Sequence, residues 1–265
     1  YAQLGWRDDG SFVLPDMVIN ANGSKQRIEP SKNIVNALQW KPARGSIDEW
    51  KKIPAVYERP GMEGFQFGFL TGFASPLFKF TNFTGAMVNM VGQRGAGKSS
   101  AALCANSVWG HRKQGWADIE HDTQRAFYGK LGVLGNLLAT YDEITNIDPD
   151  RMSDLAYAVT KGQGRQRLTQ SGAAAENFGG WELLMLSTAN APMHSRLSLE
   201  KADASAEASR IFEYHLPQNT MTKSEADSTF DQLNNHFGVA AEPYVTNLVK
   251  NREKVAARVH AWIKE

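Results

Sequence analysis

The second half of the chain alternates short apolar runs with stretches of helical periodicity. From residue 86 onward the apolar runs have the length of β-strands, and the segments between them repeat their apolar residues with the period of a helix. This alternation is typical of an α/β fold with a mainly parallel sheet covered by helices. The expected strands are 86–91, 116–119, 137–141, 181–187 and 211–215, and the expected helices are 99–112, 122–134 and 149–161.

The first 80 residues follow a different pattern, which predicts an N-terminal α+β module. Residues 5–15 indicate two short strands joined by an Asp-Gly turn. Ser31 is a candidate N-cap for a short helix, and a second helix is expected before Pro54. The apolar faces of these two helices are expected to consist of Ile34, Val35, Leu38, Ile47 and Trp50.

Aromatic residues are concentrated between residues 62 and 80, and we expect them to pack in the core. From Pro243 onward, apolar residues recur near one face of an expected amphipathic helix. We therefore expect an N-terminal accessory module at 1–80, an α/β core at 81–217 and a helical C-terminal segment at 218–265.

Composition narrows the class of protein. The chain has 265 residues, 42% of them hydrophobic and 22% charged, which excludes a disordered tail, a collagen-like repeat and a disulfide scaffold. Cys104 is the single cysteine, so no intrachain disulfide is available, and no Cys/His cluster has the spacing of a zinc site. We expect a reducing, cytoplasmic setting.

The net charge and the hydropathy limit the partners. With 29 basic and 28 acidic residues the formal charge is +1, so any contact with nucleic acid must come from local basic clusters. No apolar run approaches the ~18 residues of a membrane span. The chain opens on Tyr1 rather than Met, and we expect it to be part of a longer polypeptide.

One motif predicts nucleotide binding. Residues 92–99, called the phosphate loop below, match G-x-x-x-x-G-K-[ST]. An apolar strand precedes them and an Ala-rich helix follows. Glycines let backbone N–H groups curl around phosphates, and the helix N-terminus adds its positive end. Lys98 is expected to reach the β- and γ-phosphates of ATP, and Ser99 to ligate Mg²⁺. The expected nucleotide-binding residues are Gly92, Gln93, Arg94, Gly95, Ala96, Gly97, Lys98, Ser99 and Ser100.

Two further strands end in polar residues. Asp142 and Glu143 follow the strand 137–141, where Asp142 would hold Mg²⁺ through its water shell and Glu143 would deprotonate the attacking water. An acid pair in this position can also be a simple helix-capping turn. Asn190 ends the apolar run from Trp181. If this strand lies beside the phosphate-loop strand, Asn190 would sit between Lys98 and Glu143 and contact the γ-phosphate or the water; a turn asparagine is the alternative.

The order of these residues resembles that of a known group. Lys98–Ser99, then Asp142–Glu143, then Asn190 is similar to the Walker A, Walker B and sensor 1 order of AAA+ ATPases and of the related superfamily 3 helicases. Other short pieces resemble helicase-like ATPase domains of phage and integrative-element replication proteins (primase-helicases), many catalogued only as a domain of unknown function. These pieces are Leu4-Gly5-Trp6, Ser107-Val108-Trp109-Gly110, Tyr157 to Arg167 and Trp181 to Asn190.

The resemblance implies an AAA+-type P-loop NTPase core, ATP with Mg²⁺ as cofactors and a homo-oligomeric, hexameric ring. In such rings an arginine from the neighbouring subunit completes the active site. Arg210, just before the last core strand, stands where AAA+ proteins often carry it, and Arg196 is the second candidate. A surface salt bridge is the alternative for either. Arg252 and Arg258 are weak candidates for the sensor 2 arginine.

A basic loop predicts contact with DNA. Lys161, Arg165 and Arg167 lie between the acid pair and the Asn190 strand, and in ring helicases that resemble this chain a loop here points into the central pore. Basic side chains there would contact the phosphates of single-stranded DNA without reading its sequence. A solvated loop and a contact with nucleotide across the subunit interface are the alternatives.

The expected function is ATP hydrolysis coupled to translocation on DNA and its unwinding, with no membrane contact. The alternatives are an AAA+ motor acting on protein, a DNA-packaging ATPase and a non-catalytic, ATP-gated assembly module. A small-molecule kinase is disfavoured, because the Asp142–Glu143 and Asn190 arrangement suits attack by water.

Overall fold

A computed structural model describes residues 1–117, 123–163, 180–200 and 210–265. Its first element is a four-stranded antiparallel sheet in the order β1-β2-β3-β4. Gly10, at φ +81°, makes the turn between β1 and β2, as the Asp-Gly pair predicts. The strands are β1 (Gly5–Trp6), β2 (Phe12–Leu14), β3 (Met17–Ile19) and β4 (Lys25–Arg27).

Short helices connect this sheet to the core. Ser31 caps α1, with its hydroxyl accepting from Ile34 N at 3.3 Å, as predicted. α3 then lies along the helix that follows the phosphate loop. The elements are α1 (Lys32–Leu38), α2 (Ile47–Lys52), the 3₁₀ turn η1 (Pro54–Glu58), α3 (Glu63–Ala74) and the 3₁₀ turn η2 (Ser75–Phe80).

The core is a parallel sheet of five strands in the order β6-β7-β8-β5-β9, which confirms the α/β prediction. β8 lies between β5 and β7, so residues separated by about a hundred positions become neighbours. The strands are β5 (Gly85–Val91), β6 (Trp116–Ala117), β7 (Ala139–Tyr141), β8 (Leu183–Ala189) and β9 (Ile211–His215). The helices among them are α4 (Lys98–Asn106), α5 (Gln124–Leu134), α6 (Pro149–Lys161) and α7 (Met193–Glu200), with the 3₁₀ turn η3 (Ile144–Asn146) after β7.

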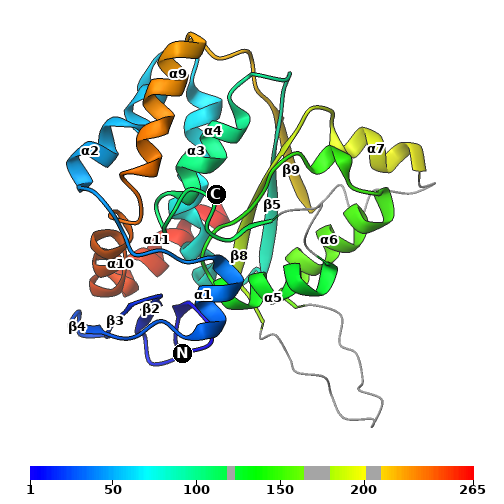
Figure 1. Ribbon diagram of the computed structural model, residues 1–265. Coiled ribbons are helices and arrows are strands. Elements are labelled where there is room, and N and C mark those ends of the chain that lie inside the picture. The colour runs from blue at the N-terminus through cyan, green and yellow to red at the C-terminus, as the bar shows by residue number, and fades with distance from the viewer. Residues whose placement is uncertain (118–122, 164–179, 201–209) are drawn as a thin grey trace.

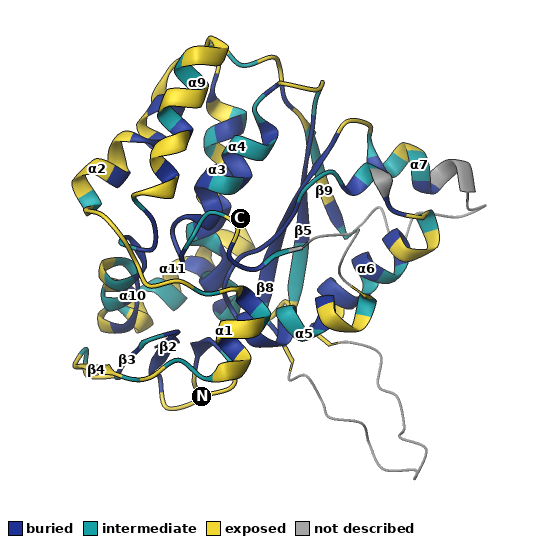
Figure 2. Ribbon diagram, in the orientation of Figure 1, coloured by how far each residue is buried: buried dark blue, intermediate teal, exposed yellow. Residues whose placement is uncertain are grey.

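Helices cover both faces of this sheet. Figure 1 shows α3 and α4 on one side and α6 on the other. All seven residues of β8 are buried, and Figure 2 shows the central strands buried while the outer sides of α2 and α9 are exposed. In the part of the chain that the structure describes, none of the helices has the length and apolar character needed to cross a membrane.

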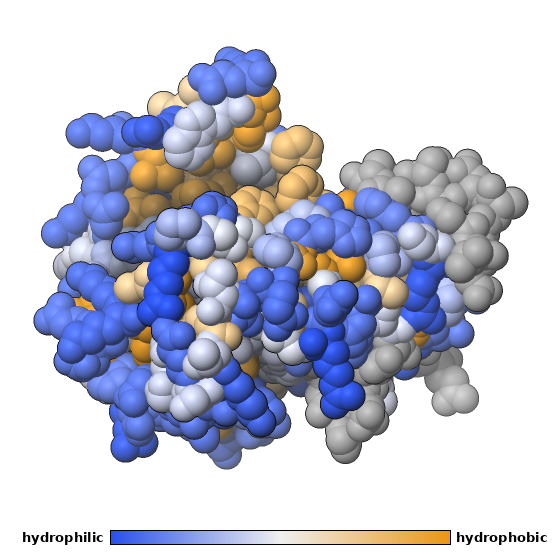
Figure 3. All heavy atoms as spheres, turned by 90° about the horizontal axis from the view of Figure 1, so that it is seen from above, coloured by the Kyte–Doolittle hydropathy of each residue, from blue (hydrophilic) through white to orange (hydrophobic). Residues whose placement is uncertain are grey.

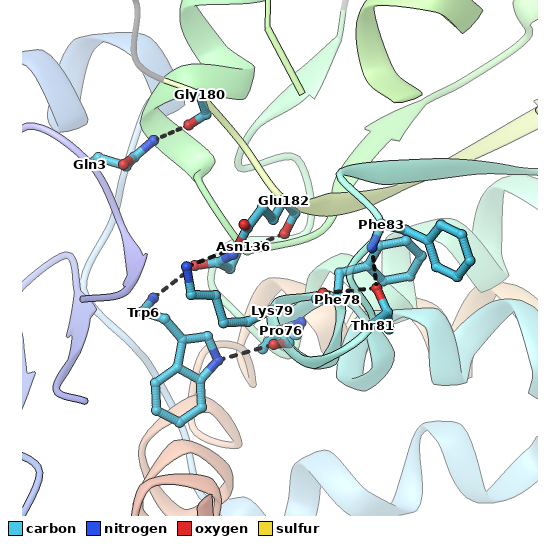
Figure 4. A network of polar contacts seen from close by, with 10 residues as sticks. All are labelled: Gln3, Trp6, Pro76, Phe78, Lys79, Thr81, Phe83, Asn136, Gly180 and Glu182. Carbon is cyan, nitrogen blue, oxygen red and sulfur yellow. Dashed lines mark hydrogen bonds and ion pairs between the residues drawn. The ribbon is translucent and has the colours of Figure 1, made fainter. Parts of the chain in front are cut away.

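Asn136 ties the N-terminal sheet to the core, as Figure 4 shows. Its Oδ1 accepts from Trp6 N at 2.8 Å, and its Nδ2 donates to Glu182 O at 2.9 Å. The Trp6 indole donates to Pro76 O at 3.0 Å, and Gln3 Nε2 donates to Gly180 O at 2.6 Å. One buried core runs through the three expected segments. Their boundaries stay predictions.

Two helices differ from their expected lengths. α4 ends at Asn106 instead of residue 112, and the Asn106 side chain donates to Arg112 O at 3.0 Å and to Gln114 O at 2.6 Å, which holds the following residues in a turn. The C-terminal segment contains α9 (Lys223–Phe230), the 3₁₀ turn η4 (Asp231–Asn234), α10 (Ala241–Lys250) and α11 (Arg252–Lys264). The single helix expected from Pro243 is therefore wrong. Asn251, at φ −113° and ψ 21°, separates α10 from α11.

Some expected core residues are exposed. In α1 only Ile34 and Leu38 are buried, and Val35 is exposed. In the aromatic stretch Phe65 and Phe69 are buried, whereas Phe67 is 45% exposed. Phe67 lies on the side of α3 that faces the edge strand, with its ring centroid 5.7 Å from that of Phe212. The spacing of aromatic residues predicted burial correctly for one side of α3 and incorrectly for the other.

Candidate functional site

The phosphate loop joins β5, which lies between β8 and β9 in the sheet, to α4. Gly95 and Gly97 have φ values of +80° and +102°, a region that favours glycine. A Cβ at Gly95 would meet no atom within 4 Å, so the loop is open there. The first backbone bond of α4 runs from Ala101 N to Gly97 O at 3.1 Å, so the N–H groups of the preceding turn have no acceptor inside the helix. The loop therefore has the backbone geometry of an anion site.

Lys98 is buried at the start of α4. Its Nζ donates to Gly92 O at 2.8 Å, Gln93 O at 3.0 Å and Asn190 Oδ1 at 3.0 Å. Burial lowers the pKa of the Lys98 ammonium because it removes water from the charged form, although the Glu143 carboxylate partly offsets this. A buried cation held against the loop backbone is suited to contact a bound phosphate.

Asn190 lies between Lys98 and Glu143. Its Oδ1 accepts from Lys98, and its Nδ2 donates to Glu143 Oε2 at 2.6 Å. This arrangement follows from the strand order. Asn190 follows β8, which lies between β5, the strand before the phosphate loop, and β7, the strand before the acid pair. The three side chains meet at the carboxyl ends of parallel strands, where α/β folds bind their ligands. Figure 3 views the molecule from this end and shows apolar residues near the middle of the face, bordered by hydrophilic ones.

Asp142 and Glu143 follow β7 directly. Asp142 Oδ1 accepts from the hydroxyl of Ser99 at 2.9 Å and from that of Thr188 at 2.6 Å. Glu143 adopts the left-handed conformation, at φ 53° and ψ 56°. The Thr145 hydroxyl donates to Glu143 Oε1, so both oxygens of this carboxylate are held. The acid pair is therefore anchored to β8 and to the phosphate-loop helix.

The oxygen atoms of Ser99 and Asp142 fit a Mg²⁺ ion. Among the residues that the structure describes, no group of three or more His, Cys, Asp or Glu side chains could hold a metal by itself. Mg²⁺ does not need such a group, because it keeps several waters and is held by one or two protein oxygens together with substrate phosphates. A hydroxyl and a carboxylate 2.9 Å apart beside the phosphate loop match this requirement.

Four polar residues of the site do not belong to the sequence motifs. Thr188 and Thr145 hold the acid pair. Gln218 Nε2 donates to Gly95 O at 3.0 Å, and Asn219 Nδ2 donates to Ala96 O at 2.7 Å. In the sequence, Gln218 and Asn219 are marked only by a polar segment after the last strand. A threonine in a strand does not indicate a functional role until its neighbours in the sheet are known.

The candidate arginines lie in different places. Arg210 precedes β9, with its guanidinium carbon 4.3 Å from the centre of the Tyr157 ring. Because Ile211 pairs with Met87 and His215 with Val91, Arg210 lies at the opposite end of the sheet from its own phosphate loop. Arg196 is on α7, which follows Asn190.

The sensor 2 candidates lie on α11. The Arg252 guanidinium carbon is 5.9 Å from the centre of the Trp6 ring, and that of Arg258 is 5.0 Å from the centre of the Trp262 ring.

The basic loop is described only at its base. Lys161 is the last residue of α6, is exposed, and has its Nζ 5.5 Å from the centre of the Tyr157 ring. Trp181 N donates to Gly162 O at 2.8 Å, which joins the two ends of the segment. Arg165 and Arg167 lie outside the described residues.

The geometry can be compared with known proteins. Residues 1–177 match the family model "Domain of unknown function (DUF927)", which is more than half of the chain. The chain belongs to the DUF927 family. The residues that match the DUF927 model include the N-terminal sheet, the phosphate loop and the acid pair. No curated protein matches the sequence.

Solved structures show which fold this member of DUF927 has. The structure "SCCmec type IV Cch - active helicase" aligns with a TM-score of 0.70 and 19% identity, over 97% of this chain and 48% of that one. The chain thus spans about half the length of that helicase. The JCV helicase aligns with a TM-score of 0.42 and 8% identity, over 82% of this chain and 60% of that one. The apo NrS-1 C-terminal region aligns with a TM-score of 0.40 and 14% identity, over 97% and 60%. The fold is that of helicase P-loop NTPases.

Proposed function

We propose that this chain is the ATP-hydrolysing part of a ring-shaped DNA helicase, of the kind used in phage or mobile-element replication. The observation that carries the proposal is the contact series from Lys98 through Asn190 to Glu143, with distances of 3.0 and 2.6 Å. It places a cation, an amide and a carboxylate base beside the Ser99–Asp142 pair. The fold shared with an active helicase supports the same proposal.

In this proposal each residue has a separate task in ATP hydrolysis. Lys98 and the loop N–H groups bind the phosphates, and Ser99 and Asp142 hold the hydrated Mg²⁺. When bound, Mg²⁺ neutralises negative charge on the phosphate oxygens. Glu143 orients the attacking water and accepts its proton, while Asn190 keeps Glu143 aligned with Lys98.

The active site is completed by a neighbouring subunit. Arg210 precedes β9, at the end of the sheet opposite its own phosphate loop, and this position supports a role in the next subunit of a ring. Such an arginine is worth roughly 10³–10⁵ in rate. Arg196 is the alternative. By the resemblance to AAA+ and superfamily 3 proteins, the ring is a homohexamer in the cytoplasm.

The DNA path is assigned to the basic loop. Lys161, Arg165 and Arg167 contact the phosphates of a single strand in the central pore. Lys161 starts this loop at the end of the sheet opposite the phosphate loop, where α6 passes the beginning of β5. A loop there is free to bind DNA while ATP occupies the other end.

The test is unwinding of a forked duplex by the assembled protein with ATP, together with ATP hydrolysis measured with and without single-stranded DNA. We expect DNA-stimulated hydrolysis and strand separation. Glu143→Gln is expected to bind ATP but to lose turnover almost completely, because it keeps the geometry and loses the base.

A loop variant separates DNA binding from hydrolysis. Replacing Lys161, Arg165 and Arg167 with Ala is expected to flatten the slope of log affinity against log salt by ~0.7 for each lost contact, while ATP binding persists. A rate of ATP hydrolysis that does not change when DNA is added would point to a motor acting on protein. Stimulation by duplex DNA without strand separation would point to packaging, and ATP binding without turnover to an assembly module.

A further inference from the structure

Thr188 lies between the two acids of the site. It is on β8, fully buried, and its side chain faces the end of β7. Its hydroxyl donates to Asp142 Oδ1 at 2.6 Å and accepts from Glu143 N at 2.9 Å. A hydroxyl has one proton to donate and lone pairs to accept with, so both sides of this group are used. One side chain therefore contacts both residues of the acid pair.

The contact with Glu143 holds an unfavourable backbone. Left-handed φ and ψ are unfavourable for a residue with a Cβ, and such a conformation persists only where its surroundings hold it. The bond from Glu143 N to Thr188 fixes this residue where the chain turns out of β7. The turn sends the Glu143 side chain toward Asn190 and Thr145. Without the Thr188 hydroxyl, the half-buried N–H of Glu143 would also lose this acceptor.

The contact between Thr188 and Asp142 involves one oxygen of the Asp142 carboxylate, Oδ1. Thr188 and Ser99 both donate to Oδ1, and neither bond uses Oδ2. Partners of this kind orient a carboxylate toward a metal, and their removal typically lowers metal affinity or activity by ~10–100-fold. Thr188 thus acts on the cation side and on the base side of the same site.

We propose that Thr188 is a positioning residue that sets Asp142 for the hydrated Mg²⁺ and Glu143 for the attacking water. This inference rests on the proposed ATP hydrolysis, and it concerns how the site is aligned. Thr188 does not touch the reacting atoms. Its effect passes through the two carboxylates that it holds.

The neighbouring strand offers a matched control. Thr140 is on β7, is fully buried, and within the described residues its hydroxyl has no hydrogen-bond partner. Replacing Thr140 with Val keeps the shape and removes a buried polar atom that is not satisfied, which is neutral or stabilising. Thr140→Val therefore reports the cost of a Thr-to-Val change in this sheet without any effect on the acid pair.

The experiment compares Thr188→Val, Thr188→Ser and Thr140→Val in the assembled protein. For Thr188→Val we expect kcat to fall by ~10–100-fold and the Mg²⁺ concentration for half-maximal activity to rise, with KM for ATP changed by less than about threefold. Thr188→Ser keeps the hydroxyl and should stay within about threefold of wild type. Thr140→Val should match wild type in every measurement.

A second measurement does not need turnover. The extent to which Mg²⁺ tightens binding of a fluorescent ATP analogue should fall in Thr188→Val and stay unchanged in Thr140→Val. Wild-type kcat and Mg²⁺ dependence in Thr188→Val would overturn the inference. So would equal losses in both valine variants, or no rescue by serine. If the wild-type protein does not hydrolyse ATP, the proposed function is contradicted. The effect of Mg²⁺ on binding of the fluorescent ATP analogue would then still test the role of Thr188.

Discussion

Lys98 has no free proton in the arrangement that the structure shows. An ammonium group has three N–H donors, and here they point to Gly92 O, Gln93 O and Asn190 Oδ1. A phosphate that binds Lys98 must therefore replace one of these acceptors. Two are backbone carbonyls of the loop, whereas Asn190 is an exposed side chain that can rotate. The contact with Asn190 is the one that a phosphate can exchange most readily.

This exchange gives a prediction for Asn190. Asn190→Ala removes the amide oxygen that accepts from Lys98 and the amide nitrogen that donates to Glu143. We therefore expect ATP to bind nearly as before, while kcat falls by roughly 10²-fold. Isothermal titration with ATP and steady-state hydrolysis measure the two effects separately. Asn22→Ala, in an exposed turn, is the control. Unchanged kcat in Asn190→Ala would exclude Asn190 from the site.

At this scale the sequence identified the charged residues and missed those that hold them. Asp142 and Asn190 directly follow apolar strands, where a polar residue is conspicuous, and Lys98 belongs to the G-x-x-x-x-G-K-[ST] motif. Thr188 is the last residue but one of a buried strand, and a threonine there is equally compatible with packing. Its contacts depend on the register between β7 and β8, which pairs Tyr141 with Ser187 and which a linear pattern does not contain.

The close packing of α3 against α4 explains a glycine in the middle of a helix. A Cβ at Gly72 would lie 2.6 Å from Ala105 O, a backbone atom of the phosphate-loop helix. The backbone of α4 cannot yield without moving Lys98 and Ser99, which begin the same helix. Trp109 Nε1 also donates to Gly72 O at 2.8 Å, so this side of α3 is held from two directions.

Gly72→Ala should therefore destabilise the fold by roughly 1–3 kcal/mol, even though alanine favours a helix by ~1 kcal/mol. Urea unfolding measures the difference. Gly64→Ala is the matched control in the same helix. Its Cβ would meet the end of the Leu216 side chain instead of a backbone atom, so we expect a smaller loss than at Gly72. Equal stability of the two variants would contradict the close contact between α3 and α4.

The types of the core elements followed from their periodicity, but some of their ends did not. The helix at 149–161 was predicted with its observed bounds, because Asp148 caps it, Pro149 opens it and Gly162 ends it. α4 ends early through side-chain bonds of Asn106 to a later turn, which has no local signal. The break at Asn251 interrupts an apolar pattern that continues on both sides of it.

At the scale of the whole molecule, the proposal of a shared site predicts rescue in mixed assemblies. Arg210→Ala subunits should bind ATP but not hydrolyse it, and Glu143→Gln subunits should behave alike. Mixing the two should restore part of the activity, because some interfaces then combine an intact Glu143 with an intact Arg210. Hydrolysis across a series of mixing ratios measures the effect. Absence of rescue at every ratio, in assemblies shown to exchange subunits, would argue that Arg210 has no role in a neighbour's site.

The distance between Arg210 and the phosphate loop also constrains symmetry. The two lie at opposite ends of paired strands, about 17 Å apart for five residues at ~3.3 Å each. If Arg210 completes a neighbour's site, each subunit uses one surface to give and a different surface to receive. An isologous dimer could provide this contact only through a single patch that contains both Arg210 and the phosphate loop, so that each meets the other across the two-fold axis. In the proposed ring the interface is heterologous, and the rotation from one subunit to the next decides between a closed ring and an open helical filament.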